Sequence, residues 1–286
     1  MSRRVLFVVR SGTNQAPEVA RAAAAGLLAN NIEVLCAHED VDLLNLPDVV
    51  SSSDATGCEL VVVFGGDGTI LSGIELARPA DVPVLGVNLG HVGFLAEAEP
   101  ENIDAVVSAI VEHNWIVEER MTLAISVTGP ERQAWNSWAL NEVAIEKDAR
   151  ERMIQVLVSI DDRPLSQWSA DGLLCSTPTG STAYAFSAGG PVVWPEVDAM
   201  LVVPISAHAL FARPLVVAPT STVDVAVTKG PVVISADGRR TTEVSAGSAV
   251  TIVRAEQSTK FARLHQVPFT ERLVAKFELP VQGWGA

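Results

Sequence analysis

The chain has 286 residues, of which 48% are hydrophobic and 19% are charged. This composition supports a large buried core and excludes an intrinsically disordered chain, and the length suits two domains of ordinary size. Aspartate and glutamate total 34 against 20 lysines and arginines, so the formal net charge is -14. Because binding to nucleic acid or to an anionic membrane needs positive charge, we expect neither nucleic acid nor membrane among the partners.

No segment is predicted to cross a membrane or to act as a signal peptide. The apolar run at residues 5–9 is interrupted by Arg10 and is too short for a signal peptide, so it predicts a first buried strand. The most apolar stretch, residues 199–218, is broken by prolines, a histidine and an arginine. Three cysteines without CxxC spacing predict neither a disulfide framework nor a zinc site, and they indicate a reducing, cytoplasmic location.

In the first third of the chain, short apolar runs alternate with helical patterns. Strands are predicted at residues 5–9, 32–35, 60–64 and 84–88, and helices at residues 17–30, 70–77 and 101–113. The continuous apolar run from Leu60 to Phe64 is typical of a parallel strand covered on both faces. Residues 38–57 are polar and acidic and predict a surface loop. Together these elements predict an α/β domain with a Rossmann-like layered sheet.

After Arg120 the pattern changes to strands separated by turn signals. The predicted strands are residues 122–127, 139–145, 154–160, 222–227, 232–235, 249–253 and 260–264. With only one or two short helices among them, they predict a β-rich domain. Residues 270–277 then predict a last helix with Thr270 as its cap.

The strongest local motif is GGDGT at Gly65 to Thr69, between a buried strand and a helix. Glycines let the backbone approach a ligand closely, and free N–H groups at a helix start favour a phosphate. Asp67 is unusual there because a carboxylate repels phosphate. It fits if it takes a proton from an attacking hydroxyl or engages a metal, whereas the alternative is a helix cap in an ordinary Asp-Gly turn.

Several common motifs are missing. None of the four lysines follows a glycine, so the chain has no Walker A site, and it contains neither a GxGxxG nor a GxSxG segment. A phosphate site in this chain must therefore be of another kind, and a serine nucleophile is not expected.

A second motif runs from Asp171 to Tyr184, where an apolar strand enters a turn rich in threonine, serine and glycine. Hydroxyl groups at the start of a helix suit a ligand rich in oxygen. Tyr184 is the single tyrosine, and its ring can stack on a base or a nicotinamide. The alternative is a capped helix with a buried, satisfied tyrosine.

Polar residues also interrupt one of the predicted strands. Asn141 and Glu142 lie between Leu140 and Val143, and neighbouring strand residues face opposite ways, so one of the two is buried. A sugar diol or a carboxamide can partner it, or else an internal hydrogen bond. His208 is interpreted as a core residue, and residues 237–240 as a hairpin turn.

Four segments taken together resemble the NAD kinase family, bacterial type, whose members phosphorylate NAD to NADP. They are GGDGT at residues 65–69, NLGHVGFL at residues 88–95, Asn141–Glu142, and residues 171–187 with their TPTGSTAY core. GGDGT alone also occurs in related versions in lipid kinases and phosphofructokinases, whereas the other three segments in this order are specific. The resemblance implies an α/β domain of residues 1–120 plus 268–286 and a β-rich NAD-binding domain of residues 121–267.

The resemblance also implies roles for individual residues. Asp67 would be the general base that takes the proton from the 2′-hydroxyl of the adenosine ribose, and the oxygen would attack the terminal phosphoryl group of ATP or polyphosphate. Gly65, Gly66 and Gly68 would cradle phosphates, with a divalent cation, Mg²⁺, whose protein ligands stay unassigned. Arg152 would reach a phosphate. The implied NAD-binding residues are Asn141, Glu142, Asp171, Thr182, Ala183, Tyr184 and Ser187.

Two departures from the family pattern concern the phosphoryl donor. Ser72 and Ser169 stand where many members have a basic residue, so the choice between ATP and polyphosphate stays open. The resemblance implies a homo-oligomer, either a dimer or a tetramer. One alternative is a non-catalytic NAD(P) sensor on the same fold, which retention of Asp67 disfavours. Another is a GGDGT lipid kinase, which the absence of a basic patch and of an amphipathic anchor disfavours.

Overall fold

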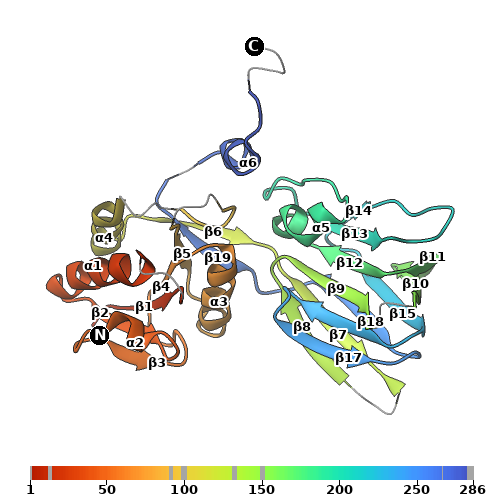
Figure 1. Cartoon of the computed structure of the whole chain (residues 1–286), viewed down its shortest axis with the longest axis horizontal. Coiled ribbons are helices and arrows are strands. Elements are labelled where there is room, and N and C mark those ends of the chain that lie inside the picture. Colours follow the sequence, from red (N-terminus) through yellow and green to blue (C-terminus); the bar gives the residue numbers. More distant parts are fainter. Residues whose placement is uncertain are drawn as a thin grey trace. The chain divides into compact units, whose positions relative to one another are not determined.

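A computed structural model describes residues 2–11, 15–89, 93–97, 102–130, 134–148, 152–265 and 267–281 of the chain. The chain divides into two compact units, one of Met1–Glu119 with Thr259–Ala286 and one of Arg120–Ser258 (Figure 1). Each unit has its own hydrophobic core. No helix in the described ranges is long and apolar enough to cross a membrane.

The first unit is built on a seven-stranded sheet with the order β3-β2-β1-β4-β5-β19-β6. Its strands are β1 (Arg4–Val9), β2 (Glu33–Ala37), β3 (Val50–Ser52), β4 (Leu60–Phe64), β5 (Val84–Val87), β6 (Ile116–Arg120) and β19 (Thr259–Arg263). The pairs from β3 across to β19 are parallel. All residues of β4 are buried, which confirms the prediction of a parallel strand covered on both faces.

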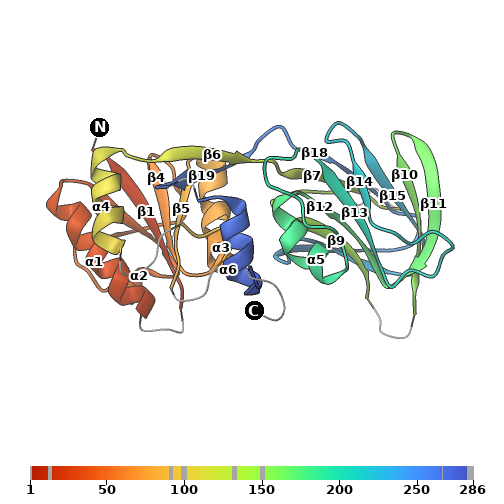
Figure 2. The ribbon, with the colours of Figure 1, turned by 90° about the horizontal axis from the view of Figure 1, so that it is seen from above.

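Helices cover both faces of this sheet. Those packed on it are α1 (Gln15–Ala29), α2 (Val41–Leu44), α3 (Asp67–Ala77) and α4 (Ile103–Glu112), with a 3₁₀ turn at Arg78–Ala80. The last helix, α6 (Phe269–Phe277), follows β19 and has no buried residue. Helices α1 and α4 lie side by side (Figure 2), and a Cβ on Gly26 of α1 would lie 2.9 Å from Cγ1 of Val107 on α4. On the other face α3 packs so closely on β4 that a Cβ on Gly73 would lie 2.3 Å from Cγ2 of Val63.

The second unit consists of two six-stranded antiparallel sheets, with the orders β11-β10-β15-β18-β7-β8 and β14-β13-β12-β9-β16-β17. The first sheet contains β7 (Leu123–Thr128), β8 (Ala134–Ala139), β10 (Ile154–Ile160), β11 (Arg163–Ala170), β15 (Val223–Lys229) and β18 (Ala249–Arg254). The second contains β9 (Glu142–Lys147), β12 (Gly172–Ser176), β13 (Met200–Ile205), β14 (Leu215–Val217), β16 (Val232–Ala236) and β17 (Arg240–Val244).

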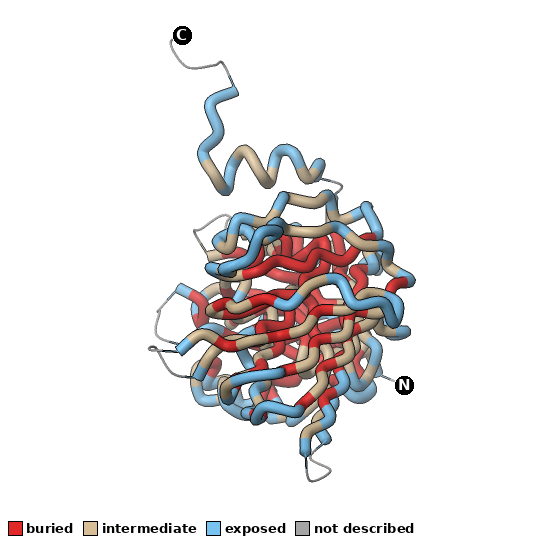
Figure 3. The backbone as a smooth tube through the Cα atoms, turned by 90° about the vertical axis from the view of Figure 1, so that its right-hand side faces the viewer, coloured by how far each residue is buried: buried red, intermediate tan, exposed pale blue. Residues whose placement is uncertain are grey.

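The short helical elements of this unit follow β12. They are a 3₁₀ turn, η4 (Thr179–Thr182), and α5 (Tyr184–Ser187). Alternating burial along strands such as β10 and β15 places apolar side chains between the sheets, where Trp168 is fully buried. Figure 3 shows the buried segments of the chain in red and the exposed segments in pale blue. The predicted fold class, an α/β domain plus a β-rich domain, is confirmed.

Several local predictions are corrected. The surface loop predicted at 38–57 contains α2 and the edge strand β3, because buried Leu44 and Val49 anchor it to the core. The strand predicted at 139–145 is two strands in different sheets, since β8 ends at Ala139 and β9 begins at Glu142. Asn141 therefore lies in the connection, ahead of the strand.

The return of the chain to the first unit also differs from the prediction. It occurs at Thr259, because β19 pairs with β5 and buries Phe261, whereas the predicted β-rich domain ran on to residue 267. The last helix begins at Phe269 after Pro268 and has no side-chain cap, so Thr270 is not its cap. Strands β6, β11, β13, β14 and β17 were not predicted. Polar residues along β11 and β17 leave only part of their period-2 pattern visible.

Candidate active site

The GGDGT segment joins β4 to α3 at the carboxyl end of the parallel strands. Ligands of open α/β sheets bind at this edge. The N–H of Gly65 still donates to the carbonyl of Val87 on the neighbouring β5, at 3.0 Å, and Gly66 is the N-cap of α3. The first N–H groups of a helix have no acceptor within it, so those of Asp67 and Gly68 can face an anion.

The three glycines of this turn differ in whether the surrounding structure requires glycine. A Cβ on Gly65 would lie 2.5 Å from Oγ1 of Thr69, so the turn itself requires glycine there. A Cβ on Gly66 or Gly68 would meet nothing within 4 Å. The φ of Gly66 is -87°, which any residue adopts. The chain's own packing thus explains Gly65 but not the other two, whose missing side chains leave the helix start open to a ligand.

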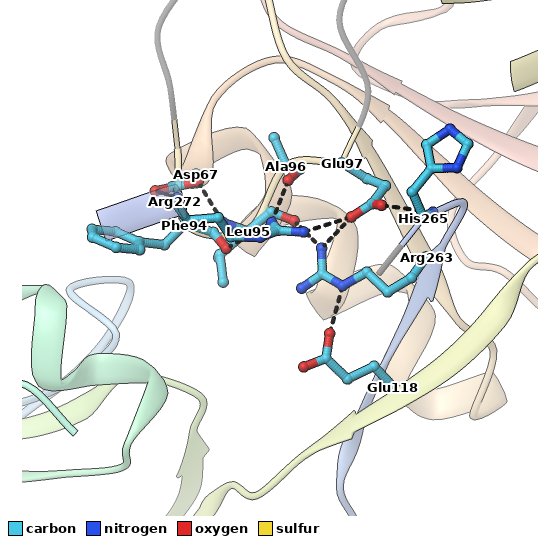
Figure 4. A network of polar contacts seen from close by, with 9 residues as sticks. All are labelled: Asp67, Phe94, Leu95, Ala96, Glu97, Glu118, Arg263, His265 and Arg272. Carbon is cyan, nitrogen blue, oxygen red and sulfur yellow. Dashed lines mark hydrogen bonds and ion pairs between the residues drawn. The ribbon is translucent and has the colours of Figure 1, made fainter. Parts of the chain in front are cut away.

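Asp67 is the first residue of α3, and its carboxylate is held by a different segment of the unit. Oδ2 accepts the N–H of Phe94 at 3.1 Å and Oδ1 accepts the N–H of Leu95 at 3.2 Å (Figure 4). Since Gly66 is the N-cap and no side chain caps the helix, the alternative interpretation of Asp67 as a cap is wrong. Each carboxylate oxygen still has an unused lone pair with which to accept a proton.

Gly93, the second glycine of the NLGHVGFL segment, lies directly against the carboxylate of Asp67. A Cβ at this position would lie 2.3 Å from Oδ1 of Asp67. Any other residue would therefore push the carboxylate away from the N–H groups of Phe94 and Leu95. Residues 90–92 of the same segment lie outside the described part of the chain.

In the second unit, the connection before β9 is fixed by one buried carboxylate. Asp237 accepts the N–H groups of Leu140 at 2.9 Å, Asn141 at 2.7 Å and Glu142 at 3.3 Å. It also pairs with Arg240 at 2.9 Å. Burial raises the pKa of Asp237, against the opposing effect of these N–H groups and of Arg240. The hairpin turn predicted at residues 237–240 is present. The hydrogen bonds from residues 140–142 to Asp237, called the Asp237 clamp below, were not predicted because the partners lie far apart in sequence.

Glu142 is the buried member of the Asn141–Glu142 pair, with 7% of its surface exposed. Burial, followed by the charge of Asp237, raises the pKa of Glu142 to about 8. The backbone N–H of Tyr184 acts in the opposite direction. The Oε2 atom of Glu142 is buried and has no hydrogen-bond partner in the described chain. A buried polar atom without a partner costs free energy, so a ligand hydroxyl or amide is the natural partner.

The TPTGSTAY segment is tied directly to this pair. Thr177 donates its N–H to the carbonyl of Asn141 at 2.9 Å and its hydroxyl to the carbonyl of Leu140 at 2.5 Å. A Cβ on Gly180 would lie 2.0 Å from the carbonyl oxygen of Asn141, so only glycine fits. Two motifs that are more than thirty residues apart thus form one structure.

Tyr184 lies at the surface of this cluster. The residue is 37% exposed, which contradicts the alternative of a buried tyrosine. Its hydroxyl donates to Oε1 of Glu146 at 2.7 Å, and burial followed by this bond raises its pKa to about 12. The charges of Glu142 and Asp171 also act on it, which places both carboxylates nearby.

The remaining candidate residues occupy varied positions. Asp171, between β11 and β12, pairs with Lys147 at 2.6 Å. The hydroxyl of Thr182 donates to the carbonyl of Thr179 at 3.3 Å. Ala183 joins η4 to α5, and Ser187 ends α5 and is exposed. Arg152 is exposed ahead of β10, and nothing among the described residues links it to the cluster.

Comparison with known proteins assigns both groups of residues to domains of one family. Residues 5–115 match the ATP-NAD kinase N-terminal domain and residues 140–264 match the ATP-NAD kinase C-terminal domain. A protein of Streptomyces avermitilis named NAD kinase 2 is 49% identical over 291 residues, which cover 99% of this chain and 97% of that protein. The chain belongs to the NAD kinase family. The NAD kinase of Mycobacterium tuberculosis is 48% identical over 300 residues, covering 99% of this chain and 98% of the relative.

Solved structures of the NAD kinase family share the fold. A yeast NADH kinase complexed with NADH superposes with a TM-score of 0.90 at 22% identity, covering 100% of this chain and 90% of that one. An NAD kinase from Archaeoglobus fulgidus in complex with ATP has a TM-score of 0.72 at 24% identity, covering 97% of this chain and 99% of that one. At these identities the likeness concerns the fold.

The two serines that depart from the NAD kinase pattern form hydrogen bonds with neighbouring residues of the protein. Ser72 of α3 donates to the carbonyl of Gly68 at 3.4 Å, and the hydroxyl of Ser169 accepts from Gln155 at 3.4 Å. The carbonyl of Ser169 accepts the N–H of His208 at 2.7 Å. His208 is exposed, so its interpretation as a core residue is wrong.

The side chains of the described residues do not form a metal centre by themselves. In the described ranges, no group of three or more His, Cys, Asp or Glu residues lies close enough to hold a metal ion. Mg²⁺ commonly keeps several waters and binds through one or two carboxylates plus substrate phosphates. A site of this kind needs no cluster of protein side chains, so the described residues are compatible with a magnesium ion held mainly by substrate phosphates.

Proposed function

We propose that this chain transfers the terminal phosphoryl group of ATP to the 2′-hydroxyl of the adenosine ribose of NAD and so forms NADP. It is then a phosphotransferase with an alcohol group as acceptor. The observation that carries the proposal is the carboxylate of Asp67, held by the N–H groups of Phe94 and Leu95 at the open start of α3. A carboxylate held in this way can accept a proton without first having to be ordered.

The chemical step follows from that position. Asp67 accepts the proton of the 2′-hydroxyl while the ribose oxygen forms a bond to the terminal phosphorus of ATP. The bond between that phosphorus and the bridging oxygen breaks, and ADP leaves with the bonding electron pair. Gly65, Gly66 and Gly68 would bring backbone N–H groups against the donor phosphates. Mg²⁺ bound to the donor would neutralise charge on its phosphate oxygens.

The second unit supplies the residues for NAD. Glu142, whose pKa is raised to about 8, is largely protonated at neutral pH. It can then donate its O–H to a ribose oxygen, or receive a hydrogen bond at its unpartnered Oε2. The exposed ring of Tyr184 offers a face for stacking, and Arg152 offers a charge for a phosphate. The other proposed contacts are Asn141, Asp171, Thr182, Ala183 and Ser187.

The ligands of two related proteins support NAD and ATP as the substrates. The yeast relative is described in complex with NADH and the archaeal relative in complex with ATP. Polyphosphate is the alternative donor. The comparisons offer no support for a lipid kinase or a non-catalytic sensor, because the relatives named NAD kinase match nearly the whole chain.

A homo-oligomer and a cytoplasmic location belong to the same proposal. Leu210, Phe211 and Trp194 of the second unit are exposed in one chain, and large exposed apolar side chains favour association. The cysteines are buried and free, as expected for a reducing compartment. Light scattering on the purified chain tests whether it is a dimer or a tetramer.

The deciding experiment is NADP formation from NAD with magnesium and ATP, with polyphosphate in a parallel reaction. A glucose-6-phosphate dehydrogenase that accepts only NADP reports the product. Product with ATP supports the proposal, and product with polyphosphate widens the donor range. If calorimetry detects NAD binding but neither donor gives NADP, the chain is a sensor and the proposal fails.

A further inference from the structure

Residues 93–97 are bound on two sides, and only one of these sides is explained by Asp67. The N–H groups of Phe94 and Leu95 donate to Asp67. The carbonyl groups of the same stretch are bound by two arginines from the last part of the chain, Arg263 of β19 and Arg272 of α6 (Figure 4). All of these residues belong to the first unit.

Arg272 binds two of the three carbonyls. Its Nη1 donates to the carbonyl of Ala96 at 2.7 Å and to that of Phe94 at 3.3 Å. Its Nη2 pairs with Oε2 of Glu97 at 2.8 Å. The guanidinium is 11% exposed and the Glu97 carboxylate 1% exposed, so this ion pair is well shielded from solvent. A buried ion pair is costly to break on one side.

Arg263 binds the carbonyl in between. Its Nη1 donates to the carbonyl of Leu95 at 3.0 Å and to Oε2 of Glu97 at 3.1 Å. Its Nε donates to Glu118 of β6 at 2.5 Å. Two guanidinium groups therefore share one buried carboxylate, and together they bind the carbonyls of three consecutive residues.

The planarity of the peptide bond connects the two sides. The carbonyl of Phe94 and the N–H of Leu95 belong to the same rigid trans peptide group, in which C=O and N–H point in opposite directions. Arg272 holds the oxygen end and Asp67 holds the hydrogen end. A hydrogen bond at one end also polarises the group and strengthens the bond at the other.

The rings of α6 add to this attachment. The ring centroid of Phe94 lies 5.8 Å from that of Phe269 and 5.9 Å from that of Phe277. The N–H of Glu97 donates to the carbonyl of Gly86 on β5 at 2.8 Å, which fixes the far end of the stretch. Residues 93–97 are thus held between β5 and α6.

We propose that Arg272, together with Arg263 and Glu97, forms a set of positioning residues that orients the catalytic carboxylate of Asp67 through residues 93–97. These three residues do not act on the substrate. They fix the peptide group between Phe94 and Leu95 so that the N–H of Leu95 points at Asp67. The last helix, α6, thereby contributes to kcat although it does not contact the substrate. This inference rests on the proposed role of Asp67 as the general base.

The test compares Arg272→Gln with a matched control on the same helix, Lys276→Gln. Lys276 is exposed on α6, so its replacement makes the same charge change away from residues 93–97. We expect R272Q to lower kcat about tenfold or more, which is part of the 10²–10⁴-fold attributed to a general base. We expect the KM values of R272Q for NAD and ATP to change less than about twofold. K276Q should have the kcat and KM values of the wild type.

Two further variants separate positioning from mere folding. R272K keeps the charge but not the planar fork, and it should restore part of kcat. In a D67N background, R272Q should lower the residual kcat less than about twofold, because no base is left to position. An equal fold-loss in both backgrounds, or a fall in melting temperature with unchanged kcat per folded molecule, would overturn the inference.

Each result also separates this inference from the proposed function. If D67N keeps wild-type kcat, the proposed base is wrong whatever R272Q does. If D67N is impaired and R272Q is not, the base stands and the positioning role fails. Should R272Q not fold, R272K and Glu97→Gln decide the question by the same split between kcat and KM.

Discussion

Two carboxylates of this chain lie beside glycine-containing turns, yet their surroundings are opposite. Asp67 is half-buried, and each of its oxygens accepts a backbone N–H. Glu142 is buried, and one of its oxygens has no partner in the described chain. The first group is oriented by the protein and open to a reactant. The second is enclosed and still lacks one partner, as a binding residue does before its ligand arrives.

The two groups also differ in what stabilises their backbone. Residues 93–97, which hold Asp67, are bound by cationic side chains from β19 and α6. The connection before Glu142 is bound by one anionic side chain, Asp237. Arg263 and Arg272 bind carbonyl groups, which leaves the N–H groups of residues 93–97 free to hold Asp67. Asp237 binds N–H groups, which leaves the carbonyls of residues 140–142 free to fix the TPTGSTAY turn.

The largest effect is expected from removing the charge of Asp67. Asp67→Asn keeps the shape but cannot accept the proton, so we expect kcat to fall by about 10²-fold or more, with NAD affinity similar or higher. Steady-state kinetics and calorimetry with NAD measure the two quantities. Asp104→Asn, in the first turn of α4, is the matched control and should be neutral. A D67N enzyme with most of its activity would remove Asp67 from the mechanism.

Each of these environments could be anticipated from the sequence only in part. GGDGT follows an unmistakable buried strand, so its place at a sheet edge was predictable. The partners of Asp67 lie 27 and 28 residues away, and no local pattern shows that N–H groups of Phe94 and Leu95 point at it. The sequence marked Asn141–Glu142 as polar in an apolar run but placed both in one strand.

Long-range pairing explains what else the sequence could not show. Asp237 and Gly238 predict a turn from their tolerance of positive φ, which the structure has at +53° and +65°. The clamp on residues 140–142, 95 to 97 residues away, depends on β9 pairing with β16. Similarly, β19 joins the first sheet because of its neighbour β5, not because of its own composition.

The next largest effect is expected from loosening that clamp. Asp237→Ala would leave three N–H groups without their acceptor and would remove the ion pair with Arg240. We expect a loss of about 3–5 kcal/mol in the free energy of unfolding, with weaker NAD binding. Urea unfolding and calorimetry measure both. Asp162→Ala, at another positive-φ turn, is the control. Unchanged NAD affinity in a folded D237A chain would show that the clamp does not serve the binding residues.

A smaller and more selective effect is expected at Gly68. Alanine there meets no atom within 4 Å and favours the helix, so Gly68→Ala should raise stability by up to about 1 kcal/mol. If donor phosphates approach the start of α3, the added methyl should raise the KM for ATP severalfold. Gly73→Ala is the contrast, because its Cβ would lie 2.3 Å from Val63 and should destabilise the fold. An unchanged KM for ATP in G68A would place the phosphates elsewhere.

The last test, a dependence on pH, concerns the enclosed carboxylate directly. The pKa of Glu142 is raised from 4.5 to about 8 in the folded chain. Below pH 4.5 both folded and unfolded states hold the proton, and this contribution to stability is fully present. Between the two values only the folded state holds it, so stability falls as pH rises towards 8 and the loss then levels off.

Glu142→Gln removes this titration while keeping the size of the side chain. We expect the melting temperature of the wild type to fall more steeply than that of E142Q between pH 5 and 8. The exposed Glu18→Gln serves as the control for a changed net charge. NAD affinity should weaken above pH 8 in the wild type, where Glu142 loses the O–H it can donate, and stay level in E142Q. If melting temperature and NAD affinity depend on pH in the same way in both proteins, Glu142 is ionised in the folded chain. It could then bind NAD only as a hydrogen-bond acceptor.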